Sequence, residues 1–179
     1  RLNQGIDRAI ALGEQMLVLA RQEAQGSQAH AATPVDLQAL VRDGITAVLP
    51  QAQARGIDLG LLEGDAVVVQ GNPDGLHILL RNLLDNAIKY TPEHGQVDVE
   101  LRRDGTVPVL AVDDSGPGLD EEGRARAFDR FYRAADAAAS GSGLGLAIVK
   151  AIADQHGATV LLVPSSRLGG LRVEVRFAA

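Results

Sequence analysis

The strongest constraint on the fold is that strand-like segments of this chain come in pairs, with helical segments between the pairs. The runs QVDVELRRD (96–104) and VPVLAVDD (107–114) are joined across an Asp-Gly turn, which predicts a β-hairpin. A second pair, ATVLLV (158–163) and LRVEVRF (171–177), closes the chain. A doubly wound parallel sheet would place a helix after every strand. The pattern therefore favours a two-layer α/β sandwich, in which helices cover a mixed, mostly antiparallel sheet.

The other predicted elements follow from apolar periodicity and from capping residues. We expect helices over residues 35–56, 73–90 and 143–157 and short strands over residues 57–64 and 66–71. Asp36 is the expected N-cap of the first helix, and Pro50 is expected to disturb its last turns. Residues 115–142 are glycine-rich and charged, without periodicity. A loop of that length in a compact domain is usually a functional lid or disordered.

Residues 2–24 form one amphipathic pattern, with apolar or small residues spaced three and four apart. Such a helix packs either on its own domain or on a partner helix. The polar segment that follows, up to Pro34, is typical of a linker, which favours a partner helix. Because the chain opens with Arg1 inside this helical pattern, we expect it to be an excised piece of a longer protein.

Composition narrows the class of protein. Of the 179 residues, 46% are hydrophobic but only 3% are aromatic, so the core must be aliphatic. The net charge of −6 argues against a nucleic-acid surface, which requires a basic stripe. There is no cysteine to form a disulfide and no apolar run of membrane-spanning length in the sequence. We therefore expect a soluble cytoplasmic chain that binds no nucleic acid.

The segment NLLDNAIKYT (82–91) places Asn82, Asn86 and Lys89 on one face of a helix and leucines on the other. The leucines explain the helix, whereas the polar stripe is either an ordinary solvated face or a site. An amide oxygen can ligate Mg²⁺ without adding negative charge, and a lysine one turn further on could meet a phosphate.

Two glycine-rich segments bear on that choice. In DDSGPGL, Asp114 is predicted to face the helices if Leu110 and Val112 do, and it is either a turn cap or the acceptor for a purine amine. In GSGLGLAIV, glycines precede and open a helix whose free N–H groups can receive a phosphate. The spacing G-x-G-x-G does not match a dinucleotide fingerprint, and no strand precedes it.

Taken together, NLLDNAIKYTP, DDSGPGL, FDRFYRA and GSGLGLAIV resemble the N, G1, F and G2 boxes of bacterial sensor histidine kinases. The resemblance covers roughly residues 34–177 and implies the Bergerat fold of the GHKL superfamily. It further implies that residues 1–25 are the second helix of a dimerisation and phosphotransfer hairpin, residues 26–33 a linker, and residues 34–179 the catalytic ATP-binding domain.

The resemblance also implies roles for individual residues. Asn86 would be the main Mg²⁺ ligand with Asn82 beside it, and Asp114 would bind the adenine amine. Arg130 and Arg133 would be lid groups that reach the γ-phosphate, while Phe128 and Phe131 would anchor the lid on apolar surface. The remaining implied ATP contacts are Lys89, Tyr90, Gly116, Gly118, Leu119, Gly141, Gly143, Leu144 and Gly145.

In such a kinase the chain would hold ATP and Mg²⁺ for transfer of the γ-phosphate to a histidine and then to a response regulator aspartate. The full-length protein would be a homodimer anchored in the bacterial inner membrane through segments absent here. The histidines of this chain (His30, His77, His94 and His156) lack the family's phosphoacceptor surroundings, so we expect no autophosphorylation. The last strand, which the resemblance implies is the floor of the pocket, carries Leu171 and Val173 where the family usually has threonine and phenylalanine.

Two other functions remain open on the sequence. A nucleotide-sensing interaction module would bind ATP without phosphotransfer. The presence of Asn86, Asp114 and the three lid glycines argues against this alternative. A serine kinase of the anti-sigma type would share the ATP boxes, but it would not explain the helix and linker before residue 34.

Overall fold

The computed structural model describes residues 12–13, 15–18, 20, 32–133 and 142–178. Its helices are α2 (Leu37–Ala54), α3 (Pro73–Tyr90), α4 (Glu121–Arg126) and α5 (Gly145–Gln155). Its strands are β1 (Thr33–Asp36), β2 (Asp58–Leu61), β3 (Val68–Gly71), β4 (Gln96–Asp104), β5 (Val107–Asp114), β6 (Thr159–Pro164) and β7 (Leu171–Arg176).

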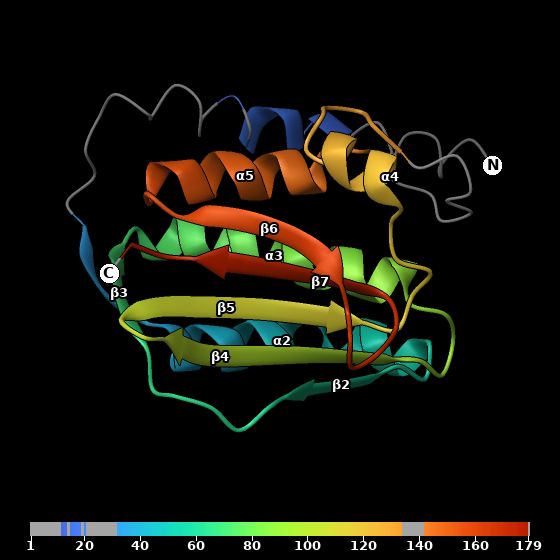
Figure 1. The fold of residues 1–179 in the computed structure, drawn as a ribbon, viewed down its shortest axis with the longest axis horizontal. Coiled ribbons are helices and arrows are strands. Elements are labelled where there is room, and N and C mark those ends of the chain that lie inside the picture. Colours follow the sequence, from blue (N-terminus) through green and yellow to red (C-terminus); the bar gives the residue numbers. More distant parts are fainter. Residues whose placement is uncertain (1–11, 14, 19, 21–31, 134–141, 179) are drawn as a thin grey trace.

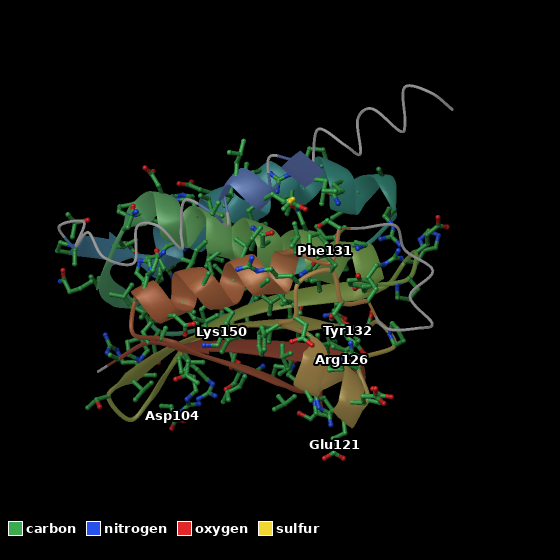
Figure 2. The ribbon with its side chains drawn as sticks, turned by 90° about the horizontal axis from the view of Figure 1, so that it is seen from above. Asp104, Glu121, Arg126, Phe131, Tyr132 and Lys150 are labelled. Carbon is green, nitrogen blue, oxygen red and sulfur yellow. The ribbon has the colours of Figure 1, made fainter. Side chains whose placement is uncertain are left out.

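Helices α2, α3 and α5 lie side by side on one face of a five-stranded sheet with the strand order β2-β4-β5-β7-β6 (Figure 1). The view from above in Figure 2 separates the helical layer from the sheet. The β4–β5, β5–β7 and β6–β7 pairs are antiparallel, whereas β2 runs parallel to β4. The predicted two-layer α/β sandwich with a mixed, mostly antiparallel sheet is therefore confirmed.

Helix α3 begins and ends where its sequence predicts. Asn72 caps it by accepting a hydrogen bond from the Asp74 N–H at 3.1 Å, and Pro73 occupies the first turn, where no N–H is needed. Its leucines are almost fully buried between the sheet and the neighbouring helices, and they continue into a core that is aliphatic as expected. This packing fixes the orientation of the opposite, polar face of α3.

Several local predictions were incomplete. Helix α2 is capped by Asp36 as predicted, but it continues through the exposed Pro50 to Ala54. Residues 115–142 were expected to be irregular, yet they contain α4. The short strands do not pair with each other: β2 joins the main sheet, and β3 pairs with β1, a strand that was not predicted and that begins one residue inside the expected linker.

The N-terminal pattern is helical at residues 12–13, 15–18 and 20. Leu12 and Val18 pack against the domain's core, whereas Met16 and Leu17 are about half exposed, at 49% and 57%. The helix therefore uses part of its apolar surface on its own domain, and two large apolar side chains face outward. The rest of this pattern and most of the expected linker lie outside the described residues.

The face of the sheet opposite the helices, which we call the outer face, is lined by charged side chains. Register places on it Asp98, Glu100, Arg102, Asp104, Val109, Ala111, Asp113, Arg172, Glu174 and Arg176. Arg172 binds Asp113, Glu100 and Glu174, the last at 2.8 Å, and Arg102 binds Glu174 at 3.1 Å. These ion pairs neutralise carboxylates that the sheet would otherwise leave crowded together. No helix among the described residues has the length and apolar character needed to cross a bilayer.

Candidate functional site

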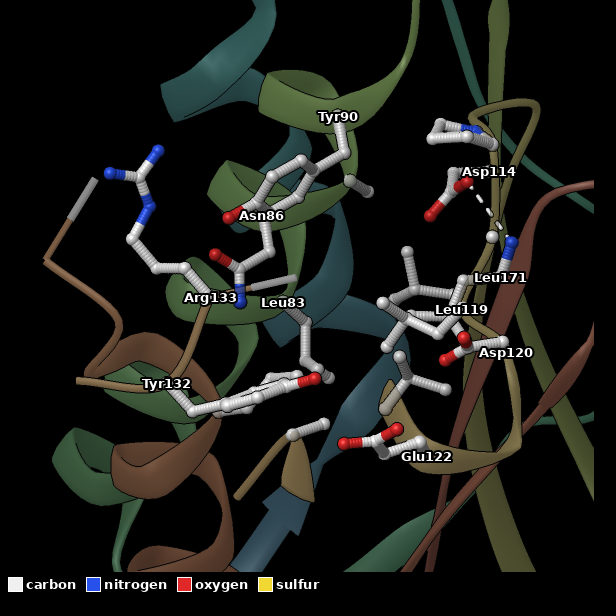
Figure 3. Close-up of a pocket in the computed structure, with 17 residues that line it drawn as sticks. Leu83, Asn86, Tyr90, Asp114, Leu119, Asp120, Glu122, Tyr132, Arg133 and Leu171 are labelled. Atoms are coloured by element: carbon white, nitrogen blue, oxygen red, sulfur yellow. Dashed lines mark hydrogen bonds between the residues drawn. The ribbon is translucent and has the colours of Figure 1, made fainter. Parts of the chain in front are cut away.

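A pocket of about 460 Å³ opens between α3, the end of β5, the start of β7 and the segment around α4 (Figure 3). It is lined by Leu83, Asn86, Ala87, Tyr90, Val112, Asp114, Pro117, Gly118, Leu119, Asp120, Glu122, Ala127, Tyr132, Arg133, Leu146, Leu171 and Val173. Its size and its mixture of aliphatic walls with polar side chains are those of a small-molecule site.

Asp114 ends β5 with its side chain on the helix-covered side, as the alternation with Leu110 and Val112 predicts. Its Oδ1 accepts backbone N–H groups from Gly116 at 2.8 Å and from Leu171 at 3.1 Å. Its Oδ2 makes no hydrogen bond with the described residues and faces the pocket (Figure 3). Burial, reinforced by the charge of Asp113, raises the pKa of Asp114 above 3.8 despite those two N–H donors. A buried carboxylate with one unpaired oxygen requires a donor from a ligand.

The turn between β6 and β7 passes directly beneath Asp114. A Cβ on Gly170 would lie 2.3 Å from both the carbonyl oxygen and Oδ1 of Asp114. This close approach lets the next residue, Leu171, donate its N–H to Asp114. Only glycine at position 170 permits the contact that orients the carboxylate.

On the opposite wall, α3 presents Asn86 and Tyr90 to the pocket (Figure 3). The first residue of α5 packs against the Asn86 amide, since a Cβ on Gly145 would lie 2.9 Å from Nδ2 and 3.1 Å from Oδ1. Asn82 lies one turn before Asn86 and does not line the pocket. Its Nδ2 donates to the Ile78 carbonyl at 2.8 Å.

Lys89 and Tyr90 form a local pair at the end of α3. Lys89 Nζ donates to the Tyr90 hydroxyl at 3.0 Å and also lies 4.4 Å from the centre of its ring. Tyr90 lines the pocket, whereas Lys89 does not. The ammonium group is therefore held at the rim, one side chain away from the cavity.

The segment after α4 closes one end of the pocket with Tyr132 and Arg133. The Arg126 guanidinium lies 4.4 Å from the centre of the Tyr132 ring. Phe128 packs against the core as expected of a lid anchor, but the same expectation for Phe131 is wrong. Phe131 is 53% exposed and has a φ of +63°, and its N–H donates to the Gly143 carbonyl at 3.0 Å.

The predicted residues fall into three groups. Asn86, Tyr90, Asp114, Gly118, Leu119 and Arg133 line the pocket together. Seven others do not line it, although four of these, Lys89, Gly116, Gly143 and Gly145, pack against residues that do; the remaining three are Asn82, Arg130 and Leu144. Gly141 lies outside the described residues.

Sequence reasoning did not identify most of the apolar wall. Leu83, Val112 and Leu146 have the periodicity of core residues, and nothing in the sequence distinguishes a core residue from a pocket wall. Tyr132 was also missed, although its position between Phe131 and Arg133 in a quoted motif was an available signal.

Chemically, the pocket offers an acceptor for a ligand amine at Asp114, and an amide, a tyrosine hydroxyl and a guanidinium on the opposite side. The carboxylates of Asp120 and Glu122 also line it. The apolar walls between them suit a flat ring system. The described residues contain no group of three or more histidine, cysteine or carboxylate side chains able to hold a metal ion. A cation here would need ligands from a bound molecule in addition to an amide oxygen.

Comparison with known proteins agrees with this geometry. Residues 71–179 match the family described as histidine kinase-, DNA gyrase B- and HSP90-like ATPases. The chain belongs to this family, and it has the ATP-binding catalytic domain found in sensor histidine kinases.

Among relatives, sensor protein QseC of Escherichia coli K12 is 40% identical over 161 residues, which is 89% of this chain and 35% of QseC. Sensor protein kinase PmrB of Pseudomonas aeruginosa is 36% identical over 178 residues, which is 98% of this chain and 36% of PmrB. The chain thus spans about a third of the length of these relatives.

Solved structures show the same fold. The mycobacterial sensor histidine kinase MprB superposes with a TM-score of 0.72 at 30% identity, covering 82% of this chain and 96% of that one. Full-length ShkA in complex with AMPPNP gives a TM-score of 0.79 at 29% identity, covering 98% of this chain and 36% of that one.

Proposed function

We propose that the pocket holds Mg²⁺-ATP, with the base at Asp114 and the triphosphate toward Asn86, Lys89 and Arg133. The observation that carries this proposal is the Oδ2 of Asp114, which faces the cavity and makes no hydrogen bond with the described residues. The exocyclic amine of adenine would supply the missing donor. Arg130 is a further candidate for the γ-phosphate.

The residues present fit a magnesium ion that is held mainly by the nucleotide. Asn86 would supply one neutral oxygen, with Asn82 as a second candidate if its amide leaves the Ile78 carbonyl. Phosphate oxygens and water would complete the coordination, as is usual for Mg²⁺. The bound ion would neutralise charge on the phosphate oxygens. Gly145, packed on the Asn86 amide, fixes its orientation without adding a side chain.

In the whole protein, the γ-phosphoryl group would pass to a ring nitrogen of a histidine outside residues 1–179, breaking the bond to the β-phosphate oxygen and releasing ADP. A response regulator aspartate would then take the phosphoryl group from that histidine. None of the three described histidines lines the pocket, and two of them are engaged elsewhere. His77 Nδ1 lies 2.9 Å from the Pro73 carbonyl, and His156 Nε2 accepts the Asn72 N–H at 3.0 Å.

The proposal extends to the domains and the cell. Residues 1–25 would be the second helix of the hairpin that carries the histidine, residues 26–33 a linker, and residues 34–179 the catalytic domain. The full-length kinase would form a homodimer and be anchored in the bacterial inner membrane, with this part in the cytoplasm. The outward-facing Met16 and Leu17 support a partner for the N-terminal helix.

Calorimetric titration of AMPPNP into the chain, with and without Mg²⁺, tests the site. We expect binding that strengthens with Mg²⁺, and Asn86→Ala should remove that strengthening while the protein stays folded. An absence of binding by a folded chain would contradict the proposal. With the upstream helix and its histidine restored, labelled ATP should label histidine, whereas tight binding without label would indicate a nucleotide-sensing module instead.

ATP hydrolysis by this chain should be very slow. The family resemblance implies that hydrolytic members carry a glutamate base at the position matching Asn82, and an amide cannot accept a proton from water. A phosphate-release assay with Mg²⁺-ATP checks this expectation. Rapid release that Asn86→Ala abolishes would contradict it.

A further inference from the structure

The C-terminal end of α3 lacks a self-contained cap. The last carbonyls of a helix have no partner within the helix, and a glycine in a left-handed conformation often helps to satisfy them. Here the chain leaves the helix at Thr91 with φ −69° and ψ 133°, because Pro92 disfavours a helical conformation in the residue before it. Thr91 is almost fully buried, and its hydroxyl has no hydrogen-bond partner among the described residues.

Arg55 supplies the missing donors. Its NH1 donates to the carbonyls of Ile88 and Lys89, the latter at 3.2 Å, and its NH2 donates to the Thr91 carbonyl at 2.8 Å. A guanidinium presents several N–H donors in a rigid plane, which lets one side chain serve three carbonyls. Its positive charge also lies at the negative end of the α3 dipole.

The main chain of Arg55 is itself fixed. Arg55 is the C-cap of α2, and its N–H donates to the Ala52 carbonyl at 3.1 Å. Its own carbonyl accepts the N–H of His94 at 3.1 Å. The half-buried guanidinium therefore reaches α3 from a main chain held on both sides.

The turn that Arg55 holds carries part of the site. Tyr90 lines the pocket and binds Lys89, and Asn86 lies one turn earlier. The Tyr90 carbonyl packs against Gly116, where a Cβ would lie 2.7 Å away, and the Gly116 N–H binds Asp114 at 2.8 Å. The end of α3 thus braces both the polar end of the pocket and the carboxylate at its other end.

We propose that Arg55 is a positioning residue for nucleotide binding, which clamps the last turn of α3 so that Lys89 and Tyr90 are held at the pocket and the Asp114 loop is supported. The inference rests on the proposed function for its ligand. Arg55 itself does not line the pocket and acts through the residues it holds.

The test compares Arg55→Ala and Arg55→Lys with Arg42→Ala, which removes an exposed arginine from α2, the helix that Arg55 follows. Amide hydrogen exchange, measured without nucleotide, should rise about tenfold or more at residues 88–91 in Arg55→Ala and stay unchanged in α5. AMPPNP affinity with Mg²⁺ should fall about tenfold at a temperature where the variant is fully folded. Arg55→Lys should recover part of both losses, because an ammonium keeps the charge but cannot span three carbonyls. Arg42→Ala should change neither.

A general rise in exchange across α5, or wild-type affinity in a variant with fast exchange at residues 88–91, would overturn the positioning role. If Arg55→Ala does not fold, Arg55→Lys decides alone: wild-type exchange and affinity in that variant would contradict the clamp. Should the wild-type chain bind no AMPPNP, the nucleotide assignment fails and the positioning role fails with it. The exchange data would then still report whether Arg55 orders the end of α3, which distinguishes the two failures.

Discussion

Asp113 and Asp114 are adjacent at the end of β5, but the two faces of the sheet give their carboxylates different partners. On the outer face, Asp113 is bound by Arg172 and by the Ser165 hydroxyl at 2.6 Å. On the helix-covered face, Asp114 receives two backbone N–H groups on one oxygen and leaves the other unpaired. A carboxylate paired within the fold serves stability, whereas a buried carboxylate left partly unpaired costs stability and serves a ligand.

The substitution that should destabilise the protein most lies on the outer face. Arg172→Gln should lower the free energy of unfolding by about 3 kcal/mol, because it removes the cation shared by three carboxylates in a mostly buried network. Denaturant unfolding measures this loss, and AMPPNP affinity should change little. Arg167→Gln is the control: its pair with Asp98 is 44% exposed on the arginine side, so about 1 kcal/mol or less should be lost. Equal losses in the two variants would contradict the importance of the network.

Replacing either aspartate by asparagine should affect nucleotide affinity in one case and stability in the other. Asp114→Asn should weaken AMPPNP binding by about 2 to 3 kcal/mol, roughly 30- to 150-fold, because an amide group cannot provide the charged acceptor. Its melting temperature should be unchanged or higher. Asp113→Asn should instead retain affinity and unfold more easily, by about 1 to 3 kcal/mol. Titration calorimetry and thermal melting on both variants check the pair, and a loss of affinity in Asp113→Asn alone would reverse the assignment.

A smaller effect is expected at Gly145. The Cβ of Gly145→Ala would meet the Asn86 amide at 2.9 Å and displace it, so the Mg²⁺-dependent part of AMPPNP affinity should fall by about 1 kcal/mol, roughly fivefold. Affinity measured without Mg²⁺ should not change. The control is Gly60→Ala, whose Cβ would lie in open space. Gly105→Ala would not serve, because Gly105 has a positive φ. An equal loss with and without Mg²⁺ would contradict the metal-binding role of Asn86.

The smallest effect is a difference in pH dependence between the two faces. Although burial opposes it, hydrogen bonds from Arg172 and Arg102 hold the pKa of Glu174 below 4.5, so its contribution to stability is lost as the pH falls below 4.5 through that pKa. Burial raises the pKa of Asp114 above 3.8, so its effect has the opposite sign: it favours folding as the pH falls from neutral through that raised pKa toward 3.8. AMPPNP affinity should weaken over the same interval, because protonation removes the charged acceptor.

Unfolding free energies of the wild type, Asp114→Asn and Glu174→Gln at a series of pH values between 3.5 and 7, a range chosen around these ordinary pKa values, separate the two contributions. The free energy of unfolding of Asp114→Asn should lack the gain that protonation of Asp114 gives as the pH falls. That of Glu174→Gln should lack part of the loss that protonation of Glu174 causes. Parallel pH profiles for all three proteins would contradict the difference between the faces.

The features that the sequence predicted well are those set by neighbouring residues. Asn72 and Pro73 begin α3 and Pro92 ends it, while the Asp-Gly turn fixes the β4–β5 hairpin, so both have the predicted bounds. The position of Asp114 on the helix-covered face also follows from strand alternation alone.

The features that the sequence did not predict depend on contacts between residues distant in the chain. The parallel pairing of β2 with β4 and the β1–β3 pair have no local signal, and Arg55 gains its role only because two helix ends meet 33 residues apart in the chain. The walls of the pocket were missed for another reason. Leu83 and Leu146 belong to the same apolar pattern as the core, so the sequence does not show that they border a cavity.

The chain has no tryptophan and two tyrosines, and both tyrosines, Tyr90 and Tyr132, line the pocket. Each ring lies beside a cation, Lys89 or Arg126. Ultraviolet emission excited near the tyrosine absorption band therefore originates only from the pocket, without labels or added chromophores. The molecule thus carries a built-in optical probe of its own binding site, in which a ligand that stacks on either ring or draws away its cation should change the emission.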